Sequence, residues 1–371
     1  MAAGELVVGA SYGLEAASTR VRVLEWLRLL DLDAEVLDYL GAANARPGTL
    51  LRRPLAVLAA ERRLSALRRR PDWGRLLISR SLGPFTRGRL EADLLRRADW
   101  GVYDFDDALY ADRRGGVHRF FGEGAGWSTA VGGADLVIAG NEVLAEEALR
   151  HNPHVEVIPS CVHPGDYPDK SDYTVGAAPR LLWLGSPSTE PYLAEVAAGL
   201  LAVHRRTGAR LTVISAGERS LGELDVMVDR VAWDGTRSNA MLAEADCGIM
   251  PLPDTPFSRG KCAYKLLQYG AAGLPAVATP IGVNARVLDQ LGGLAATGPD
   301  EWADALVALL EESEQQRRDR GLQARRAVAE HYSYAAWEPA FRRALRLPEL
   351  PAPAAGGAVH PASGTGSLDP A

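Results

Sequence analysis

The strongest constraint on the fold of this 371-residue chain is the regular alternation of short apolar runs with amphipathic stretches. The helical patterns between the runs follow residues that can cap a helix start, such as Ser18 and Asn141. Alternating strands and helices imply parallel strands joined by crossovers, and hence a doubly wound sheet. In the first half the strand-like runs are residues 6–10, 35–39, 75–79, 100–105, 136–139 and 155–158.

A second, similar unit follows a break in the pattern. Prolines and glycines cluster between residues 159 and 179 without apolar periodicity, which predicts an interdomain linker. Strands are then expected at 180–184, 210–214, 230–233, 247–250 and 276–278, with helices at 190–205, 238–245, 262–271 and 302–331. Two open sheets joined by a hinge place a ligand cleft between them, at the carboxyl ends of the strands.

The domain organisation follows from these patterns. We predict an α/β protein with two Rossmann-like domains that face each other across a cleft. The tail is rich in Pro, Ala, Gly and Ser and is expected to be disordered. The predicted boundaries are 1–165 for the first domain, 166–178 for the linker, 179–331 for the second domain, 332–347 for one more helix and 348–371 for the tail.

Composition excludes several other classes of protein. The longest apolar runs have about six residues, far short of the roughly 20 needed to cross a membrane. The start of the chain does not read as a signal peptide, so we expect a cytoplasmic protein. Three cysteines without Cys-x-x-Cys spacing support neither a disulfide framework nor a zinc site.

Charge is distributed unevenly along the chain. The formal net charge is -6, yet residues 46–97 hold 14 arginines and four acids. Arg46–Arg97 could form a face for peripheral contact with anionic membrane lipid or for an anionic acceptor. Alternatively, arginine stems simply cover helix surfaces. Nucleic acid is not an expected partner, because no recognised motif accompanies the charge and the overall balance is acidic.

Lysine is rare, and two of the three lysines lie four positions apart. Lys170 falls in the predicted linker, where no role is expected, whereas Lys261 and Lys265 lie in a predicted helix that begins near Gly260–Cys262. Backbone N–H groups at a helix start, the helix dipole and two ammonium charges suit a diphosphate. The alternative is a solvated lysine face.

This segment resembles the donor-binding segment of the retaining family-4 glycosyltransferases of GT-B fold, also called glycosyltransferase group 1. The resemblance implies two domains around a sugar-nucleotide cleft, a last helix that crosses back to the first domain, a nucleoside-diphosphate sugar as co-substrate, and no metal or other cofactor. It covers most of residues 4–346. It is carried mainly by Lys261 to Asn284 and more weakly by the sequences Ser18-Thr-Arg-Val-Arg22, Tyr103-Asp-Phe-Asp-Asp-Ala-Leu-Tyr110, Val157-Ile-Pro-Ser-Cys-Val162, Leu184-Gly-Ser-Pro-Ser-Thr189, Ala245-Asp-Cys-Gly-Ile-Met-Pro-Leu252 and Tyr332-Ser333.

The sequence departs from the family pattern at two places. The family carries two glutamates separated by seven residues, and here Gly260 and Gln268 stand at those positions. Gln268 can still hydrogen-bond a ribose diol. The loop that usually supplies an Arg and a Lys to the diphosphate instead contains Ser186. We therefore expect Lys261 and Lys265 to carry the phosphate charge, with Cys262 beside them at the helix start and neutral hydrogen bonds from Ser186 and Thr189.

The sequence Asp104-Phe-Asp106-Asp107 has three interpretations. As Asp-x-Asp it could bind a divalent metal with the donor, and as a polar group after a strand it could cap a helix. In family relatives the end of this strand often carries a histidine that faces the transferred sugar. The preferred prediction is therefore that Asp106 or Asp107 binds a sugar hydroxyl or takes the acceptor proton. His118 is a weaker base candidate.

Weaker signals come from five further residues. Gly13, Arg20 and Arg22 could approach the donor phosphates or the acceptor, or the two arginines could pair on a helix surface. Arg80 faces the cleft if the third strand is in register. Trp233 lies where relatives hold the nucleobase, although a core position is equally consistent.

The predicted activity is a retaining glycosyl transfer from a nucleoside-diphosphate sugar. The acceptor is a secondary metabolite, a lipid-linked glycan or an envelope polymer. The alternatives are a nucleotide-sugar-binding protein without turnover, and an epimerase or hydrolase on the same scaffold.

Overall fold

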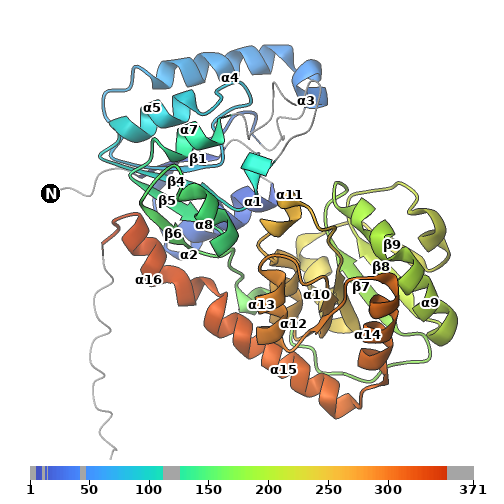
Figure 1. Cartoon of the computed structure of the whole chain (residues 1–371). Helices are drawn as coiled ribbons and strands as arrows, with labels where there is room; N and C mark the ends of the chain where they lie inside the picture. The colour runs from blue at the N-terminus through green and yellow to red at the C-terminus, as the bar shows by residue number, and fades with distance from the viewer. Residues whose placement is uncertain (1–5, 11–12, 15, 42–46, 112–125, 349–371) are drawn as a thin grey trace, which may run out of the picture.

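The computed structural model describes residues 6–10, 13–14, 16–41, 47–111 and 126–348. It contains two sheets, each with six parallel strands and helices on both faces (Figure 1). This confirms the predicted α/β class with two doubly wound sheets. His118 and the predicted tail beyond residue 348 lie outside the described residues.

The first sheet has the strand order β2-β1-β3-β4-β5-β6. Its strands are rich in Val, Leu and Ile, and β1 and β5 are buried along their whole length, as expected for strands covered on both faces. Ser79 pairs with Asp104, so the chain leaves β3 and β4 at the same edge of the sheet. The strands are β1 (Leu6–Ala10), β2 (Ala34–Leu37), β3 (Arg75–Ser79), β4 (Trp100–Phe105), β5 (Leu136–Ala139) and β6 (Val155–Val157).

Helices cover the two faces of this sheet unequally. Alternate strand residues pack in one direction against α4, α5, α7 and α8, and in the other direction against Trp26 and the last helix of the chain. The helical elements are α1 (Ala17–Thr19), the π-helical η1 (Arg20–Leu24), α2 (Glu25–Leu29), α3 (Pro47–Arg52), α4 (Pro54–Leu67), α5 (Arg89–Arg97), η2 (Leu109–Ala111), α7 (Trp127–Val131) and α8 (Glu142–Ala148).

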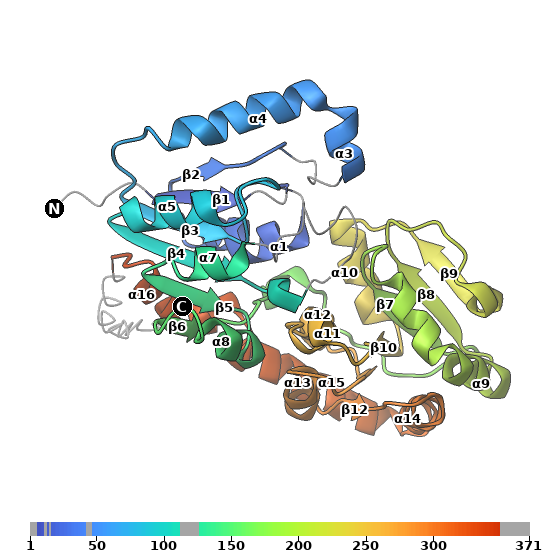
Figure 2. The ribbon, with the colours of Figure 1, turned by 45° about the horizontal axis from the view of Figure 1, so that its top comes forward.

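The second sheet has the order β12-β11-β10-β7-β8-β9 and is sandwiched in the same way (Figure 2). One face packs on α10, α12, α13 and α15, and the other on α9 and α14. The strands are β7 (Arg180–Leu184), β8 (Arg210–Ile214), β9 (Val228–Val231), β10 (Cys247–Met250), β11 (Ala276–Ala278) and β12 (Leu294–Ala295). The helical elements are η4 (Pro164–Asp166), η5 (Glu190–Val196), α9 (Ala197–Thr207), η6 (Gly222–Val226), α10 (Gly235–Glu244), α11 (Pro256–Arg259), α12 (Tyr264–Ala272), α13 (Asn284–Leu291), α14 (Pro299–Glu311) and α15 (Glu314–His331).

The last helix, α16 (Tyr334–Ala344), returns to the first domain as predicted (Figure 1). Phe341 stacks on Trp26 with ring centroids 4.2 Å apart. The Tyr334 hydroxyl donates to the carbonyl of Val21, and the Trp100 indole donates to the carbonyl of Ala344. These contacts tie the end of the chain to the domain in which it began.

Three predicted helices differ from the observed ones. The helix expected at 190–205 is the 3₁₀-helical η5 followed by α9. The helix expected at 302–331 is two helices, because Ser313 forms a capping box with Gln316 and starts α15 anew. The helix expected at 262–271 begins at Tyr264, after Ala263 adopts a left-handed conformation with φ of 53°. No helix in the described part of the chain is both long and apolar enough to span a bilayer.

Lys170 has a structural role, contrary to the expectation that it needs none. Its side chain is buried, and its ammonium donates to the carbonyls of Ala243 (3.1 Å) and Ala245 (2.7 Å) at the end of α10. Burial lowers the pKa of this lysine. Lys170 therefore fastens the linker to the second domain by satisfying the open carbonyls of a helix end.

We expect Lys170→Met to lower the free energy of unfolding by about 2 kcal/mol, because two carbonyls lose a charged donor. Denaturant unfolding followed by circular dichroism measures this. Arg205→Met, an exposed cation on α9, should change stability by less than about 0.5 kcal/mol. Equal effects of the two substitutions would contradict the capping role.

Candidate active site between the two domains

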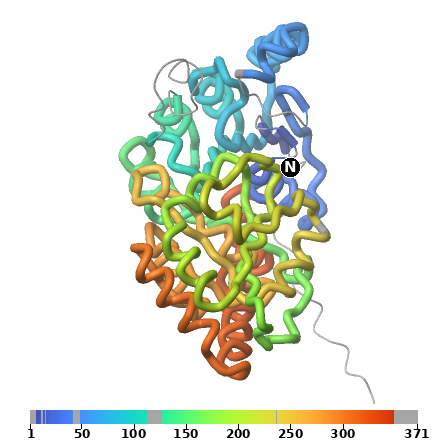
Figure 3. The backbone as a smooth tube through the Cα atoms, turned by 90° about the vertical axis from the view of Figure 1, so that its right-hand side faces the viewer, coloured from blue at the N-terminus to red at the C-terminus, as the bar shows by residue number. Residues whose placement is uncertain are grey.

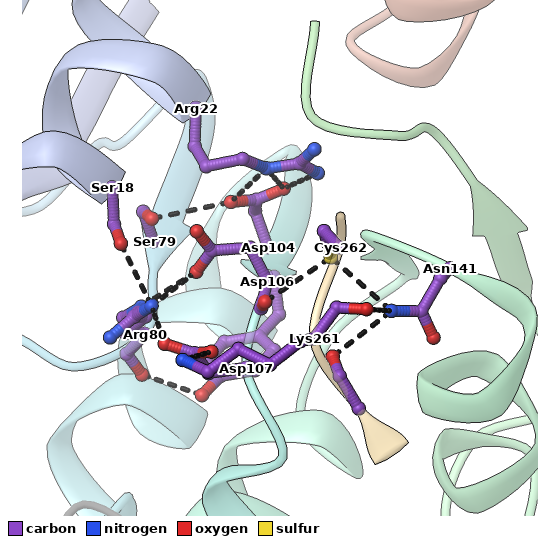
Figure 4. A network of polar contacts seen from close by, with 12 residues as sticks. Ser18, Arg22, Ser79, Arg80, Asp104, Asp106, Asp107, Asn141, Lys261 and Cys262 are labelled. Carbon is purple, nitrogen blue, oxygen red and sulfur yellow. Dashed lines mark hydrogen bonds and ion pairs between the residues drawn. The ribbon is translucent and has the colours of Figure 1, made fainter. Parts of the chain in front are cut away.

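The carboxyl ends of β3 and β4 bring Arg80, Asp106 and Asp107 together (Figure 4). Arg80 Nη2 donates to Asp106 (2.5 Å), to Asp107 (2.6 Å) and to the Ser18 hydroxyl (2.8 Å), and Arg80 Nε also donates to Asp106. Arg80 itself has a left-handed backbone with φ of 64°, which is uncommon for a residue other than glycine. One guanidinium thus orients both predicted carboxylates.

Asp104 lies two residues before Asp106 in the sequence and is part of a separate buried pair. Arg22 donates to both oxygens of Asp104 and, through Nη1, to the carbonyl of Ile158. Burial alone would lower the pKa of Arg22, but the facing carboxylate raises it. The expectation that Arg22 approaches phosphates or acceptor is corrected here, because its guanidinium is buried and held in the core.

These pairings also bear on the metal interpretation of Asp104-Phe-Asp106. Each carboxylate already faces an arginine, Asp104 with Arg22 and Asp106 with Arg80. A divalent cation placed there would meet two guanidinium charges. In the described part of the chain, no cluster of three or more His, Cys, Asp or Glu residues has a geometry suited to a metal.

Lys261 reaches from the second domain to this group. Its ammonium lies 2.6 Å from Asp107 Oδ1, while Arg80 contacts Oδ2 of the same carboxylate. Burial acts to raise the pKa of Asp107, but the Lys261 and Arg80 charges outweigh it and hold the pKa below its ordinary value. Asp107 therefore stays ionised and joins the two domains.

The position of Lys261 corrects the predicted geometry of the lysine pair. Residues 260–263 form a turn between α11 and α12, so Lys261 precedes the helix that carries Lys265. The two side chains are not one turn apart on a single helix face. They are still close enough that the charges of Lys261 and Asp107 both affect the pKa of Lys265.

Lys265 lies in the first turn of α12, beside the loop that follows β7. Its ammonium is 5.3 Å from the centre of the Trp183 ring, and a Cβ on Gly185 would lie 3.0 Å from its Cε. Burial, reinforced by the Lys261 charge, lowers the pKa of Lys265 to about 8. A lysine with this pKa is still mostly protonated at neutral pH, but it forms no ion pair with a carboxylate among the residues that the structure describes.

Asn141, which follows β5, is not among the predicted site residues although it was expected to cap a helix. Its side-chain oxygen does cap α8, accepting from the N–H of Leu144. Its amide donates to the carbonyl of Gly260 (3.0 Å) and has longer contacts to the Lys261 carbonyl and Cys262 Sγ. β5 lies next to β4 in the sheet, so a polar residue after it was a signal available in the sequence.

Gly260 is required by the packing of the two domains. A Cβ at this position would lie 2.6 Å from Ala108 Cβ and 2.9 Å from Leu144 Cδ2, both in the first domain. From the other side, a Cβ on Gly140 would lie 2.6 Å from Cys262 Sγ. The space in which a side chain at position 260 would lie is thus occupied by the first domain.

We therefore expect that Gly260→Glu, which restores the family glutamate, lowers activity at least tenfold instead of raising it. Overpacking of this kind costs about 1–3 kcal/mol and here would separate the domains. Initial rates and thermal unfolding measure the two effects. Gly176→Glu, where a Cβ would meet no atom within 4 Å, is the control. A gain of activity in Gly260→Glu would contradict this packing argument.

Asp106 differs from Asp107 in its free hydrogen-bonding capacity. Arg80 contacts Asp106 only through Oδ1, and Oδ2 has no partner among the described residues. Both oxygens of Asp107 are engaged. Asp106 is thus the carboxylate that has an oxygen available for a substrate.

The remaining predicted residues lie around this centre with varied partners. Trp233 is not in the core: its side chain is 46% exposed, and Arg20 of the first domain lies over its ring at 5.0 Å. Gln268 donates to the Tyr167 hydroxyl (3.3 Å). The Ser186 hydroxyl contacts that of Ser188 in an exposed loop. Gly13 is buried, with φ of 95° after β1.

Cys262 is held too firmly to act as a nucleophile. Its thiol donates to the carbonyl of Asp106 and accepts from Asn141. Burial raises the pKa of this thiol to about 12. Its contacts assign it to the domain interface.

The two lysines are not on the wall of the hollow between the domains. This hollow of about 490 Å³ is bordered by α8, α13 and α16, with Asn141 as the one member of the polar group on its wall. Lys261 and Cys262 instead contact the polar group of Figure 4 from the 260–263 turn. The Lys261 side chain is 22% exposed, so the turn leaves it partly open to solvent.

Comparison with known proteins places this geometry in context. Residues 178–312 match the family model of glycosyl transferases group 1. Sucrose-phosphate synthase from Thermosynechococcus elongatus superposes with a TM-score of 0.66 at 14% identity, over 92% of this chain and 98% of that one. The chain has the GT-B fold.

Two further GT-B structures resemble the chain over nearly their whole length. WaaG, a glycosyltransferase involved in lipopolysaccharide biosynthesis, has a TM-score of 0.64 at 13% identity and covers 91% of this chain and 99% of its own. HepE from Anabaena, in complex with UDP and glucose, also has a TM-score of 0.64 at 13% identity, with coverage of 92% and 99%. No curated protein sequence matches the chain. In this GT-B fold, the polar group of Arg80, Asp106, Asp107 and Lys261 lies at the junction of the two domains.

Proposed function

We propose that this protein is a retaining glycosyltransferase of family 4, which moves a sugar from a nucleoside-diphosphate sugar to an acceptor. One observation carries the proposal: Lys261 of the second domain contacts the Arg80–Asp106–Asp107 group of the first domain, and Lys265 lies in the first turn of the helix that follows, beside the loop after β7. The family match of residues 178–312 and the GT-B fold support it.

The diphosphate is proposed to replace Asp107 as the partner of Lys261. The ammonium now binds a carboxylate oxygen at 2.6 Å, and a phosphate oxygen has the same charge and acceptor geometry. Lys265 adds a second cation at the start of α12, where backbone N–H groups also favour an anion. Together they stabilise the charge that develops on the leaving diphosphate.

Asp106 is proposed to act on the sugar or the acceptor through its unoccupied oxygen. In the transfer, the bond between the anomeric carbon and a diphosphate oxygen breaks, and a bond from that carbon to the acceptor oxygen forms. The acceptor proton passes to Asp106 or to the departing phosphate. No metal ion is needed in this scheme, because lysines provide the positive charge.

The nucleoside is proposed to lie along the wall formed by Trp233 and Gln268. Trp233 is exposed enough to stack on a base if Arg20 moves from its ring. Gln268 can exchange its contact with Tyr167 for a ribose hydroxyl. Ser186, in the exposed loop after β7, provides a neutral hydrogen bond near the phosphates.

Donor entry requires a change in the domain contact. The Lys261–Asp107 ion pair and the bonds from Asn141 must open and then re-form around the substrate. Such closure excludes water and limits hydrolysis of the donor. The proposed cycle is therefore open, bind, close and transfer.

The proposal is tested by incubating the protein with a panel of nucleotide sugars and measuring release of nucleoside diphosphate. We expect release from at least one donor, increased by a suitable acceptor, and a product with the anomeric configuration of the donor. Tight binding without release would indicate a binding protein, and release of free sugar alone would indicate a hydrolase. Absence of both binding and release would refute the proposal.

A further inference from the structure

Large apolar side chains are exposed together on one part of the first domain. Among the described residues, eight large apolar side chains are exposed, and four of them belong to α3, α4 and the loop after β3. Leu51 is 82% exposed, Leu55 81%, Leu58 49% and Phe85 41%. Exposed apolar clusters of this kind usually mark an interaction surface.

The helix geometry places the leucines away from the core. α4 buries Ala60 and Leu64 against the first domain. At 100° per residue, positions 55, 58 and 62 lie on the opposite side of α4. Leu51, in α3, and Arg69, in the turn after α4, are also exposed. The exposed surface of α3–α4 is therefore apolar at its start and basic toward its end, where Arg62 and Arg69 follow.

The charge on this segment is almost entirely positive. Residues 47–70 contain seven arginines and one acid, Glu61, which accepts a hydrogen bond from the Tyr39 hydroxyl. Within the part of the chain that the structure describes, the side chains of five arginines in this segment have no hydrogen-bond or ion-pair partner. They are Arg52, Arg53, Arg62, Arg68 and Arg69.

A hollow of about 260 Å³ opens between α4 and the loop before α5. Arg68, Arg87 and Arg89 border it, together with Phe85 and Glu61. Three guanidinium groups around one hollow suit the phosphate of a lipid headgroup. The hollow thus adds a site for phosphate at the other end of α4 from the exposed leucines.

We propose that the α3–α4 face docks on an anionic lipid bilayer, with Leu51, Leu55 and Leu58 inserted at the headgroup level and the arginines paired with lipid phosphates. Interspersed leucines and unpaired arginines match the apolar and anionic layers of a membrane interface. In the side view of Figure 3, the helix of residues 54–67 stands at the outer edge of the first domain, away from the second. A planar surface can therefore approach it without contacting the other domain. This docking goes beyond the proposed transfer reaction and does not depend on it.

Sedimentation of the full chain with vesicles tests the docking. The vesicles contain phosphatidylcholine alone or phosphatidylcholine mixed with phosphatidylglycerol. We expect binding to the anionic vesicles only, weakened by salt. Leu51→Gln combined with Leu55→Gln should weaken binding at least tenfold. Arg62→Gln combined with Arg69→Gln should weaken it by about fivefold for each arginine. The control Leu322→Gln removes an exposed leucine of α15 and should have no effect.

Three outcomes would overturn the proposal. They are absence of binding to anionic vesicles, binding that the leucine variant leaves unchanged, and dimerisation through this face without vesicle binding. All substituted side chains are exposed, and circular dichroism confirms that each variant is folded. Sedimentation velocity of the wild type and the leucine variant distinguishes a second copy of the chain from a membrane as the occupant.

Discussion

Lys265→Met is expected to lower the rate of sugar transfer by about 10²–10³ at saturating acceptor, because a preorganised charge facing the leaving diphosphate is lost. The substitution should not destabilise the fold. The folded-state pKa of Lys265, about 8, lies below its ordinary value of 10.5, so burial of the protonated form costs free energy at pH 7. Methionine removes that cost. We therefore expect the free energy of unfolding to stay equal or to rise by roughly 1 kcal/mol, a figure reduced because the Lys265 side chain is partly exposed.

The pH profile of the wild-type enzyme provides an independent test of Lys265. Below pH 8 the ammonium is charged and can bind the diphosphate, and above pH 8 it is neutral. The value of kcat/KM for the donor should therefore fall as pH rises through about 8. In Lys265→Arg this fall should disappear, because a guanidinium stays charged. The same fall in both proteins would assign the titration to another group.

Asp106→Asn is expected to lower kcat by about 10²–10⁴ while nucleoside diphosphate affinity stays the same or improves. Asparagine keeps an oxygen that can accept from Arg80, but it cannot take a proton, and it removes a negative charge near the phosphates. A fall in kcat without a rise in KM separates this role from a merely structural one. Steady-state kinetics with varied donor measures both parameters.

Glu142→Gln is the matched control for Asp106→Asn. Like Asp106, Glu142 is paired with an arginine, here Arg286 of the second domain at 2.6 Å, but both side chains are about half exposed. An exposed pair contributes little, so we expect less than a twofold change in kcat. If the two substitutions have the same effect, or if Asp106→Asn weakens donor binding without changing kcat, the proposed role of Asp106 is wrong.

The fold could be predicted from the sequence because its signal is local. Buried parallel strands such as β1 and β5 are continuous apolar runs, and the helices between them carry capping residues such as Asn141. The break between α14 and α15 was missed because residues 311–320 are all polar or charged and so give no apolar period that could mark it, and only the capping box of Ser313 and Gln316 marks the boundary.

The site was predicted only in part, because only some of its contacts follow from the order of the strands. Arg80 and Asp106 could be placed together because parallel strands end at one sheet edge. The Lys261–Asp107 pair joins residues 154 positions apart, and it depends on how the two domains meet. The same is true of Gly260, whose lack of a side chain is explained by Ala108 and not by any neighbour in sequence. Local patterns carry no information about such contacts.

Titration calorimetry with nucleoside diphosphates tests the central claim most directly. The proteins compared are the wild type, the Lys261→Met/Lys265→Met double variant and Arg206→Met, which removes an exposed cation of α9 in the same domain. The account predicts that at least one nucleoside diphosphate binds the wild type and Arg206→Met equally, and the double variant at least tenfold more weakly. Equal affinity for all three proteins, or no binding to the wild type, would contradict it.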